Sequence, residues 1–252
     1  MSTAPVADTA TATVGSTGHS SFVALYRLLL RLQVTPLRIA GILALGSLEV
    51  LLGALARGDD DPLRATTEVA LGYGLGIVLP LATAWLATSS MGDLVEDRLL
   101  VYLWLKPVPR WQLPTAAVLA TVTIVVPLVM VPLVATAAVA GTTELVGSLV
   151  LASVLAVFAY AGVFVAAGLW LRRALWWSLL YILVWENGLA RAVDGAARLS
   201  IASYAQSLVA AAAGVEIAYA DRLPVASVVV PLAVGLAGLA LATIRYRRTE
   251  ID

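Results

Sequence analysis

Six apolar runs dominate this sequence, and each is close to the length that the hydrocarbon core of a bilayer requires. A membrane-spanning helix needs about 20 mostly apolar residues. The runs have 20, 22, 28, 24, 17 and 21 residues and cover 37–56, 69–90, 113–140, 148–171, 174–190 and 224–244. None alternates polar and apolar residues as the strands of a membrane β-barrel do. The sequence therefore predicts an all-α membrane protein with six transmembrane helices.

Composition excludes several other classes of protein. Hydrophobic residues make up 61% of the chain and charged residues 13%, whereas soluble domains have about 45–50% and about 25%. The 16 basic residues balance the 16 acidic ones, so we expect no nucleic-acid partner. Cysteine is absent and His19 is the single histidine. Thiolate and histidine sites for metals or catalysis are therefore not expected in this chain.

The distribution of basic residues predicts the orientation, because cytoplasmic loops carry an excess of Lys and Arg. Eleven basic residues lie on one side of the predicted topology and five on the other. The larger set is Arg27, Arg31, Arg38, Arg98, Lys106, Arg110, Arg172, Arg173, Arg245, Arg247 and Arg248. The smaller side also has the acidic loop Asp59-Asp60-Asp61. We expect a multi-pass plasma-membrane protein with both termini in the cytoplasm.

Three segments outside the runs have their own character. Residues 1–20 are polar and lack a signal-peptide pattern, which predicts a disordered cytoplasmic tail. Residues 21–35 place leucines on one face and Arg27 and Arg31 on another, which favours a helix in the membrane interface; a cytoplasmic extension of the first span is the alternative. Residues 191–223 are too apolar for a free loop, so we expect a re-entrant helical segment shielded by protein.

The loop 91–112 has acidic and basic residues on one side and leucines on the other. A helix from about 92 to 105 would end at Lys106-Pro107, since the residue before proline avoids helical geometry. Such a helix is suited to docking on a partner protein, although a solvated charged face would have the same pattern. The charged residues and the proline of interest are Asp93, Glu96, Asp97, Arg98, Lys106, Pro107 and Arg110.

At this loop the chain resembles the permease subunits of ABC-2 type ATP-binding-cassette transporters, in particular the copper-processing permeases of nitrous oxide reductase operons. Asp93, Glu96 and Asp97 fit the acidic turn of that family, and Lys106-Pro-Val-Pro-Arg110 fits its Pro-x-x-Arg signature. Arg98-Leu99 stands where Gly-Thr-Leu is usual. A second match is Trp185-Glu186, followed by Leu199-Ser200-Ile201 and Tyr204. The resemblance covers residues 21–252.

The resemblance implies a six-helix transmembrane domain over 21–252 whose loop 91–112 contains the coupling helix. It also implies a homodimeric permease and an anchor for the re-entrant segment at Trp185, Glu186, Ser200 and Tyr204. The chain lacks a phosphate-binding G-x-x-x-x-G-K-[ST] loop. ATP and Mg²⁺ therefore belong to a separate ATPase partner, and this chain is not itself expected to be an enzyme.

Two features inside the runs are candidates for the translocation path or the dimer interface. Glu49 lies thirteen residues into the first run, and a charge in a membrane is costly; the alternative is that it reaches the outer interface near Arg57. Gly72 and Gly76 form a G-x-x-x-G pattern, which permits close helix contact. Ordinary packing within the chain is the favoured explanation of that pattern.

The sequence leaves several functions open. An exporter of a hydrophobic or amphiphilic substrate is the leading hypothesis. The resemblance implies export, and the few charges in the spans favour such a substrate. Alternatively, the subunit transmits force to an extracytoplasmic partner. An intramembrane lipid or prenyl transferase needs paired Asp motifs, but Asp59–Asp61 is the single cluster of this kind. A channel or passive scaffold would need neither the loop helix nor the Pro-x-x-Arg signature.

Overall fold

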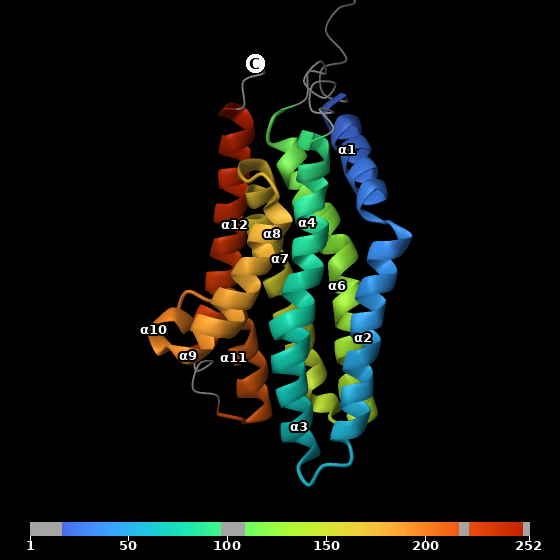
Figure 1. The fold of residues 1–252 in the computed structure, drawn as a ribbon, viewed down its shortest axis with the longest axis vertical. Helices are drawn as coiled ribbons and strands as arrows, with labels where there is room; N and C mark the ends of the chain where they lie inside the picture. The colour runs from blue at the N-terminus through green and yellow to red at the C-terminus, as the bar shows by residue number, and fades with distance from the viewer. Residues whose placement is uncertain (1–16, 97–108, 217–221, 249–252) are drawn as a thin grey trace, which may run out of the picture.

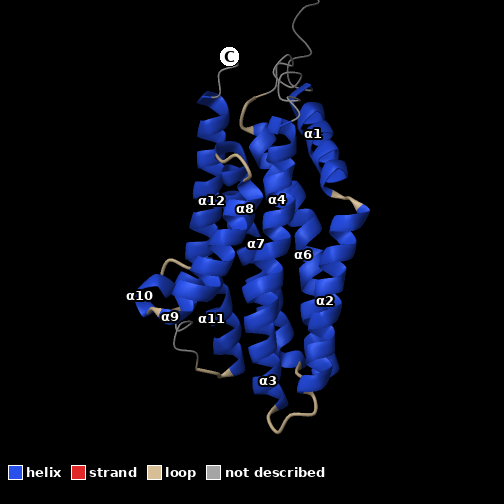
Figure 2. Ribbon diagram, viewed as in Figure 1, coloured by secondary structure: helices blue, strands red, loops and turns tan. Residues whose placement is uncertain are grey.

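The structure is a computed structural model that describes residues 17–96, 109–216 and 222–248. Throughout these ranges the regular structure is helical (Figure 2). The elements are α1 (Thr17–Gln33), α2 (Pro36–Ala56), α3 (Pro62–Val69), η1 (Ala70–Val78), α4 (Leu79–Glu96), α6 (Gln112–Ala140), η2 (Thr143–Leu145), α7 (Val146–Trp170), α8 (Ala174–Leu180), η3 (Tyr181–Leu189), α9 (Ala190–Ala192), α10 (Asp194–Ala197), α11 (Ile201–Ala213) and α12 (Pro224–Arg248).

Five helices in the described part of the chain are long and apolar enough to cross a membrane. They are Pro36–Ala56, Pro62–Met91, Gln112–Ala140, Thr143–Trp170 and Pro224–Arg248. The sixth apolar run, 174–190, is helical but does not belong to this group. Glu186, Asn187 and Arg191 lie in the second half of its helical segment and lower its hydropathy. The chain is thus an all-α protein with several apolar helices, as a membrane protein requires.

Helix α7 lies at the centre of the bundle and packs against α12, α4 and α6 (Figure 1). Its Tyr160 and Phe164 are fully buried, and their rings stack 5.5 Å apart. Against α12 it comes so close that a Cβ added to Gly162 would collide with the backbone of Gly235. Helices α2 and α12 form the outer edges and keep most of their apolar side chains exposed.

The N-terminal helix α1 packs against α6 rather than standing apart from the bundle. Leu25 and Leu29 are buried, and Gln33 donates a hydrogen bond from Nε2 to the Thr121 hydroxyl at 3.2 Å. Arg27 is exposed. Helix α2 begins at Pro36, where a missing N–H costs no helical hydrogen bond. The apolar face of α1 therefore contacts protein, and its position relative to a bilayer remains a prediction.

Two stretches have π-helical geometry, in which backbone hydrogen bonds run from residue i to residue i+5. The first, η1, lies between α3 and α4 within the second apolar helix. Leu79 closes it with a hydrogen bond from its N–H to the Gly74 carbonyl. Pro80 follows and has no N–H for the Gly76 carbonyl, its α-helical partner. The second, η3, follows α8 and contacts η1.

After α7 the chain returns along the bundle in two offset pieces. Figure 1 shows α8 starting beside the upper parts of α7 and α12, and α11 continuing toward the opposite end of the bundle. Between them, α9 and α10 project sideways. Helix α11 packs against α7 and α12, so its backbone is shielded by protein. The start of α1 and the end of α12 lie at the same end of the bundle.

Candidate functional site

The carboxylate of Glu186 is the centre of a buried polar cluster where η3 meets the first turn of α11. Its Oε1 accepts hydrogen bonds from the Tyr181 hydroxyl at 2.7 Å and from the Ile201 N–H at 3.1 Å. Its Oε2 accepts a short hydrogen bond from the Ser200 hydroxyl and a longer one from the Ala202 N–H at 3.4 Å. Glu186 is 3% exposed, so these four donors replace the water that a carboxylate needs.

Local sequence explains how this cluster forms. The π-helical register of η3 brings residues five apart onto one face, and Tyr181 and Glu186 are five apart. Ser200 caps α11, because its side chain accepts a hydrogen bond from the Ser203 N–H at 3.1 Å. The first N–H groups of a helix lack partners within the helix and carry partial positive charge. Glu186 satisfies two of these groups in α11.

A second set of contacts joins η3, α9 and α11 to the carbonyls of η1. Asn187 donates from Nδ2 to the Gly76 carbonyl at 3.0 Å, which is the carbonyl that Pro80 leaves without its α-helical partner. Gln206 donates from Nε2 to the Leu71 carbonyl at 2.7 Å. Arg191 reaches the Gly72 carbonyl at 3.5 Å. Side chains from η3, α9 and α11 therefore hold one face of η1.

Of the four residues expected to anchor the re-entrant segment, the structure brings Glu186 and Ser200 into direct contact. Trp185 is half-buried in η3. Tyr204 is buried, but its hydroxyl donates to the Arg198 carbonyl at 2.8 Å instead of reaching Glu186. Sequence reasoning missed Asn187 and Gln206. Both are amide side chains inside otherwise apolar stretches, and that is the signal that could have identified them.

Glu49 lies inside the bundle. Its side chain is fully buried, and neither carboxylate oxygen has a hydrogen-bond partner among the described residues. A Cβ added to Gly74 of η1 would collide with Oε1 of Glu49 and would lie 2.6 Å from Leu133 of α6. Glu49 thus faces η1 and α6 and is not exposed on the outer face of α2.

The two glycines of the G-x-x-x-G pattern have different surroundings. Gly72 has open space around the position of an added Cβ. A Cβ at Gly76 would lie 2.6 Å from Nη2 of Arg191 and 3.3 Å from Nε2 of Gln206. The pattern therefore faces side chains of the re-entrant region within this chain. Gly74, between them, makes the close approach to Glu49.

Most residues expected to couple to an ATPase lie at the margin of the described ranges. Asp97, Arg98, Lys106 and Pro107 fall outside them, whereas the backbone of α4 is described through Asp93 to its end at Glu96. Arg110 is exposed and donates from Nη1 to the Arg247 carbonyl in the last turn of α12, at 2.6 Å. The end of the loop is thereby attached to α12.

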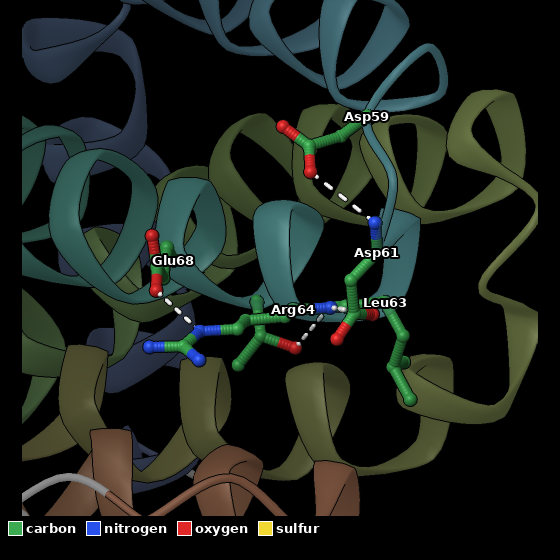
Figure 3. Close-up of polar contacts among 6 residues, drawn as sticks. Asp59, Asp61, Leu63, Arg64 and Glu68 are labelled. Carbon is green, nitrogen blue, oxygen red and sulfur yellow. Dashed lines mark hydrogen bonds and ion pairs between the residues drawn. The ribbon is translucent and has the colours of Figure 1, made fainter.

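The acidic loop between α2 and α3 uses its carboxylates locally (Figure 3). Asp61 caps α3 by accepting the Arg64 N–H at 3.1 Å, and Asp59 accepts the Asp61 N–H at 3.2 Å. Arg64 pairs with Glu68 at 3.0 Å, and both side chains are largely exposed. Within the described ranges, no three metal-ligating side chains come together. The loop is a capped turn between two helices.

No family model, curated protein or solved structure matches this chain. The geometry alone therefore defines what the site can do. A helix N-terminus is held by a buried carboxylate, and a π-helical segment is held by amide and guanidinium side chains. The first contact fastens η3 to the start of α11, and the second fastens the segment after α8 to the second long apolar helix. Such a cluster positions helices relative to one another and provides a joint between them.

Proposed function

We propose that this chain is the transmembrane subunit of an ATP-driven transporter of the ATP-binding-cassette class, working with a separate ATPase and a second copy of itself. In this proposal residues 174–190 form a sixth span, and 191–223 form a re-entrant segment on the extracytoplasmic side. The protein lies in the plasma membrane, and both of its termini face the cytoplasm. The substrate is hydrophobic or amphiphilic and is exported.

The observation that supports the proposal best is the attachment of the loop 91–112 at both ends to long apolar helices. Helix α4 continues without a break from Leu79 to Glu96, so the start of the loop is a direct extension of the second apolar helix. The other end is attached to α12 through Arg110 and the Arg247 carbonyl. A partner that pushes on this loop would move two helices at once.

The re-entrant region supports the same proposal. Its polar contacts with η1 join it to the helix that continues into α4 and the loop. Movement of α4 would therefore reach the segment around Glu186 through η1. This is the mechanical path that coupling between an ATPase and a membrane domain requires.

A second candidate function is force transmission to an extracytoplasmic protein without transport of bulk cargo. The projecting α9–α10 region favours it, because Val193 is 54% exposed and Leu199 is 71% exposed. Exposed apolar side chains at a projecting turn are suited to contact with a partner protein. In both functions the same ATPase acts on the loop 91–112.

The experiment is co-expression with the candidate ATPase, purification through a tag on this chain, and measurement of stoichiometry and ATP hydrolysis. We expect two copies of each subunit. Charge reversal at Asp93 and Glu96 is expected to reduce association or hydrolysis, whereas Arg57→Glu at the opposite end serves as the control. Failure to associate in both mild detergent and lipid nanodiscs would refute the proposed class. Full hydrolysis stimulation in the charge-reversed protein would refute the role of the loop.

A further inference from the structure

An arginine-lined cleft of about 640 Å³ opens near the end of the bundle that holds α1 and the last turn of α12. Four arginines from three parts of the chain line it: Arg38 of α2, Arg172 and Arg173 of the turn after α7, and Arg245 of α12. Thr88 and Ser89 of α4 add hydroxyl groups. Among the side chains that the structure describes, no acidic residue lines the cleft. The described lining of the cleft is therefore strongly basic.

An apolar groove adjoins the cleft at Trp170. A hollow of about 440 Å³ lies between α7 and α12 and is lined by small and aliphatic residues such as Ala167, Val234 and Ala237. Trp170 lines both the cleft and the groove, and Arg245 lies over its ring at 5.7 Å. A ligand that fills both parts must have an anionic head and a hydrocarbon tail.

Aromatic side chains locate this site at the level of the lipid headgroups. Trp170, Trp176 and Trp177 lie around the same turn and are 59%, 71% and 56% exposed. Exposed tryptophans are enriched where the hydrocarbon core of a bilayer meets water. The groove below them faces the lipid, because α12 is an outer helix of the bundle. The lipid surrounding the protein can thus enter from the side.

The backbone at Arg173 is a further sign of function. It is the single non-glycine residue with positive φ in the described part of the chain, with φ of 62°. Glycine or asparagine normally occupies this left-handed conformation. A residue held against its backbone preference is often retained for its side chain. At this position the side chain is a guanidinium that lines the cleft.

We propose that this cleft and groove bind an anionic phospholipid, with the phosphate among the arginines and one acyl chain between α7 and α12. Guanidinium groups bind phosphate oxygens through paired N–H donors. Basic pockets between helices on the cytoplasmic side are suited to anionic lipid headgroups. The inference concerns the lipid alone and does not depend on the proposed transporter function.

The test uses the full-length chain in detergent micelles, with bound lipid counted by native mass spectrometry during titration. Long-chain phosphatidylglycerol is the probe, and phosphatidylcholine and inorganic phosphate are the comparison ligands. We expect one tight site for phosphatidylglycerol and weaker binding of the other two. Equal binding of phosphatidylcholine would overturn the role of the arginines. Inorganic phosphate that displaces the lipid completely would overturn the role of the groove.

Variants separate the two halves of the site. Arg172→Ala with Arg173→Gly should weaken phosphatidylglycerol binding about 30-fold, at roughly fivefold for each arginine. Glycine suits the left-handed backbone at position 173, so the fold should persist. Arg57→Ala, at the far end of the bundle, is the control. Ala237→Phe fills the groove and should weaken long-chain lipid more than a short-chain analogue. Unchanged affinity in the double variant would refute the site.

Discussion

Replacement of Glu186 is the strongest perturbation of the re-entrant region that the structure suggests. Removal of the carboxylate leaves four donors facing one another: the hydroxyls of Tyr181 and Ser200 and the N–H groups of Ile201 and Ala202. A hydrogen bond to a charged group contributes about 1.5–3 kcal/mol. The four cannot simply be added, because groups in one network are coupled. Each buried donor that is left without a partner costs about 1–3 kcal/mol.

We therefore expect Glu186→Ala to lower the free energy of unfolding by about 3–5 kcal/mol, because buried donors lose their acceptor and a cavity remains. Glu186→Gln keeps the shape but places an NH₂ group against a donor, so we expect a loss of about 1–3 kcal/mol. The matched control is Glu68→Gln. That substitution removes a carboxylate that is 60% exposed and pairs with Arg64, and it should cost about 0.5 kcal/mol because solvent screens the pair.

The assay is unfolding of the purified protein by titration with denaturing detergent, followed by tryptophan fluorescence. Hydrogen exchange at the amides of Ile201 and Ala202 gives a local measurement. Both amides should exchange faster in Glu186→Gln and remain unchanged in Glu68→Gln. The reasoning would be refuted if the two glutamine variants unfolded alike and the two amides kept their protection.

Three further substitutions test the packing and the capping. Gly74→Ala should destabilise the protein by about 1–3 kcal/mol because its Cβ collides with Glu49. Gly72→Ala, which has open space, should be neutral or stabilise the protein by about 0.4–1 kcal/mol. Equal effects of the two substitutions would contradict the packing described for Gly74. Gly162→Ala should separate α7 from α12 and lower the midpoint of thermal unfolding, while Gly147→Ala on the same helix, again with open space, should not. Asp61→Ala should cost about 1 kcal/mol as a lost helix cap, and a similar loss in Asp60→Ala would show that the cap is not the cause.

The long apolar helices could be predicted from the sequence because twenty apolar residues have few alternatives to a membrane span. Their bounds were less predictable. The second helix begins at Pro62, whereas the apolar run begins at residue 69. The sequence does contain a signal for the earlier start, because Asp61 is a helix cap and Pro62 is a first-turn proline. The run 174–190 is predicted as a sixth span; it is helical but is not among the five helices that are long and apolar enough to cross a membrane, and its polar second half contacts the rest of the bundle.

The site was predictable only in part. An isolated Glu in an apolar run must find donors, so attention to Glu186 followed from the sequence alone. Its partners did not follow, because they depend on how η3 meets α11 in three dimensions. The π-helical segments left no trace in the hydrophobic pattern. Pro80 marks one carbonyl without an α-helical donor, but the identity of that donor, Asn187, is set by tertiary packing.

Two π-helical segments meet at this contact, since η3 packs against η1. A change from an i+5 to an i+4 register shifts the residues on either side by a fraction of a turn without breaking the helix. Helix α4 continues directly from η1, so such a change would displace the loop that begins at Glu96. Asn187 and Gln206 hold carbonyls of η1, so the same change would displace the re-entrant region. One change of register in η1 would therefore displace the end of α4 and the segment that carries Asn187 and Gln206 together.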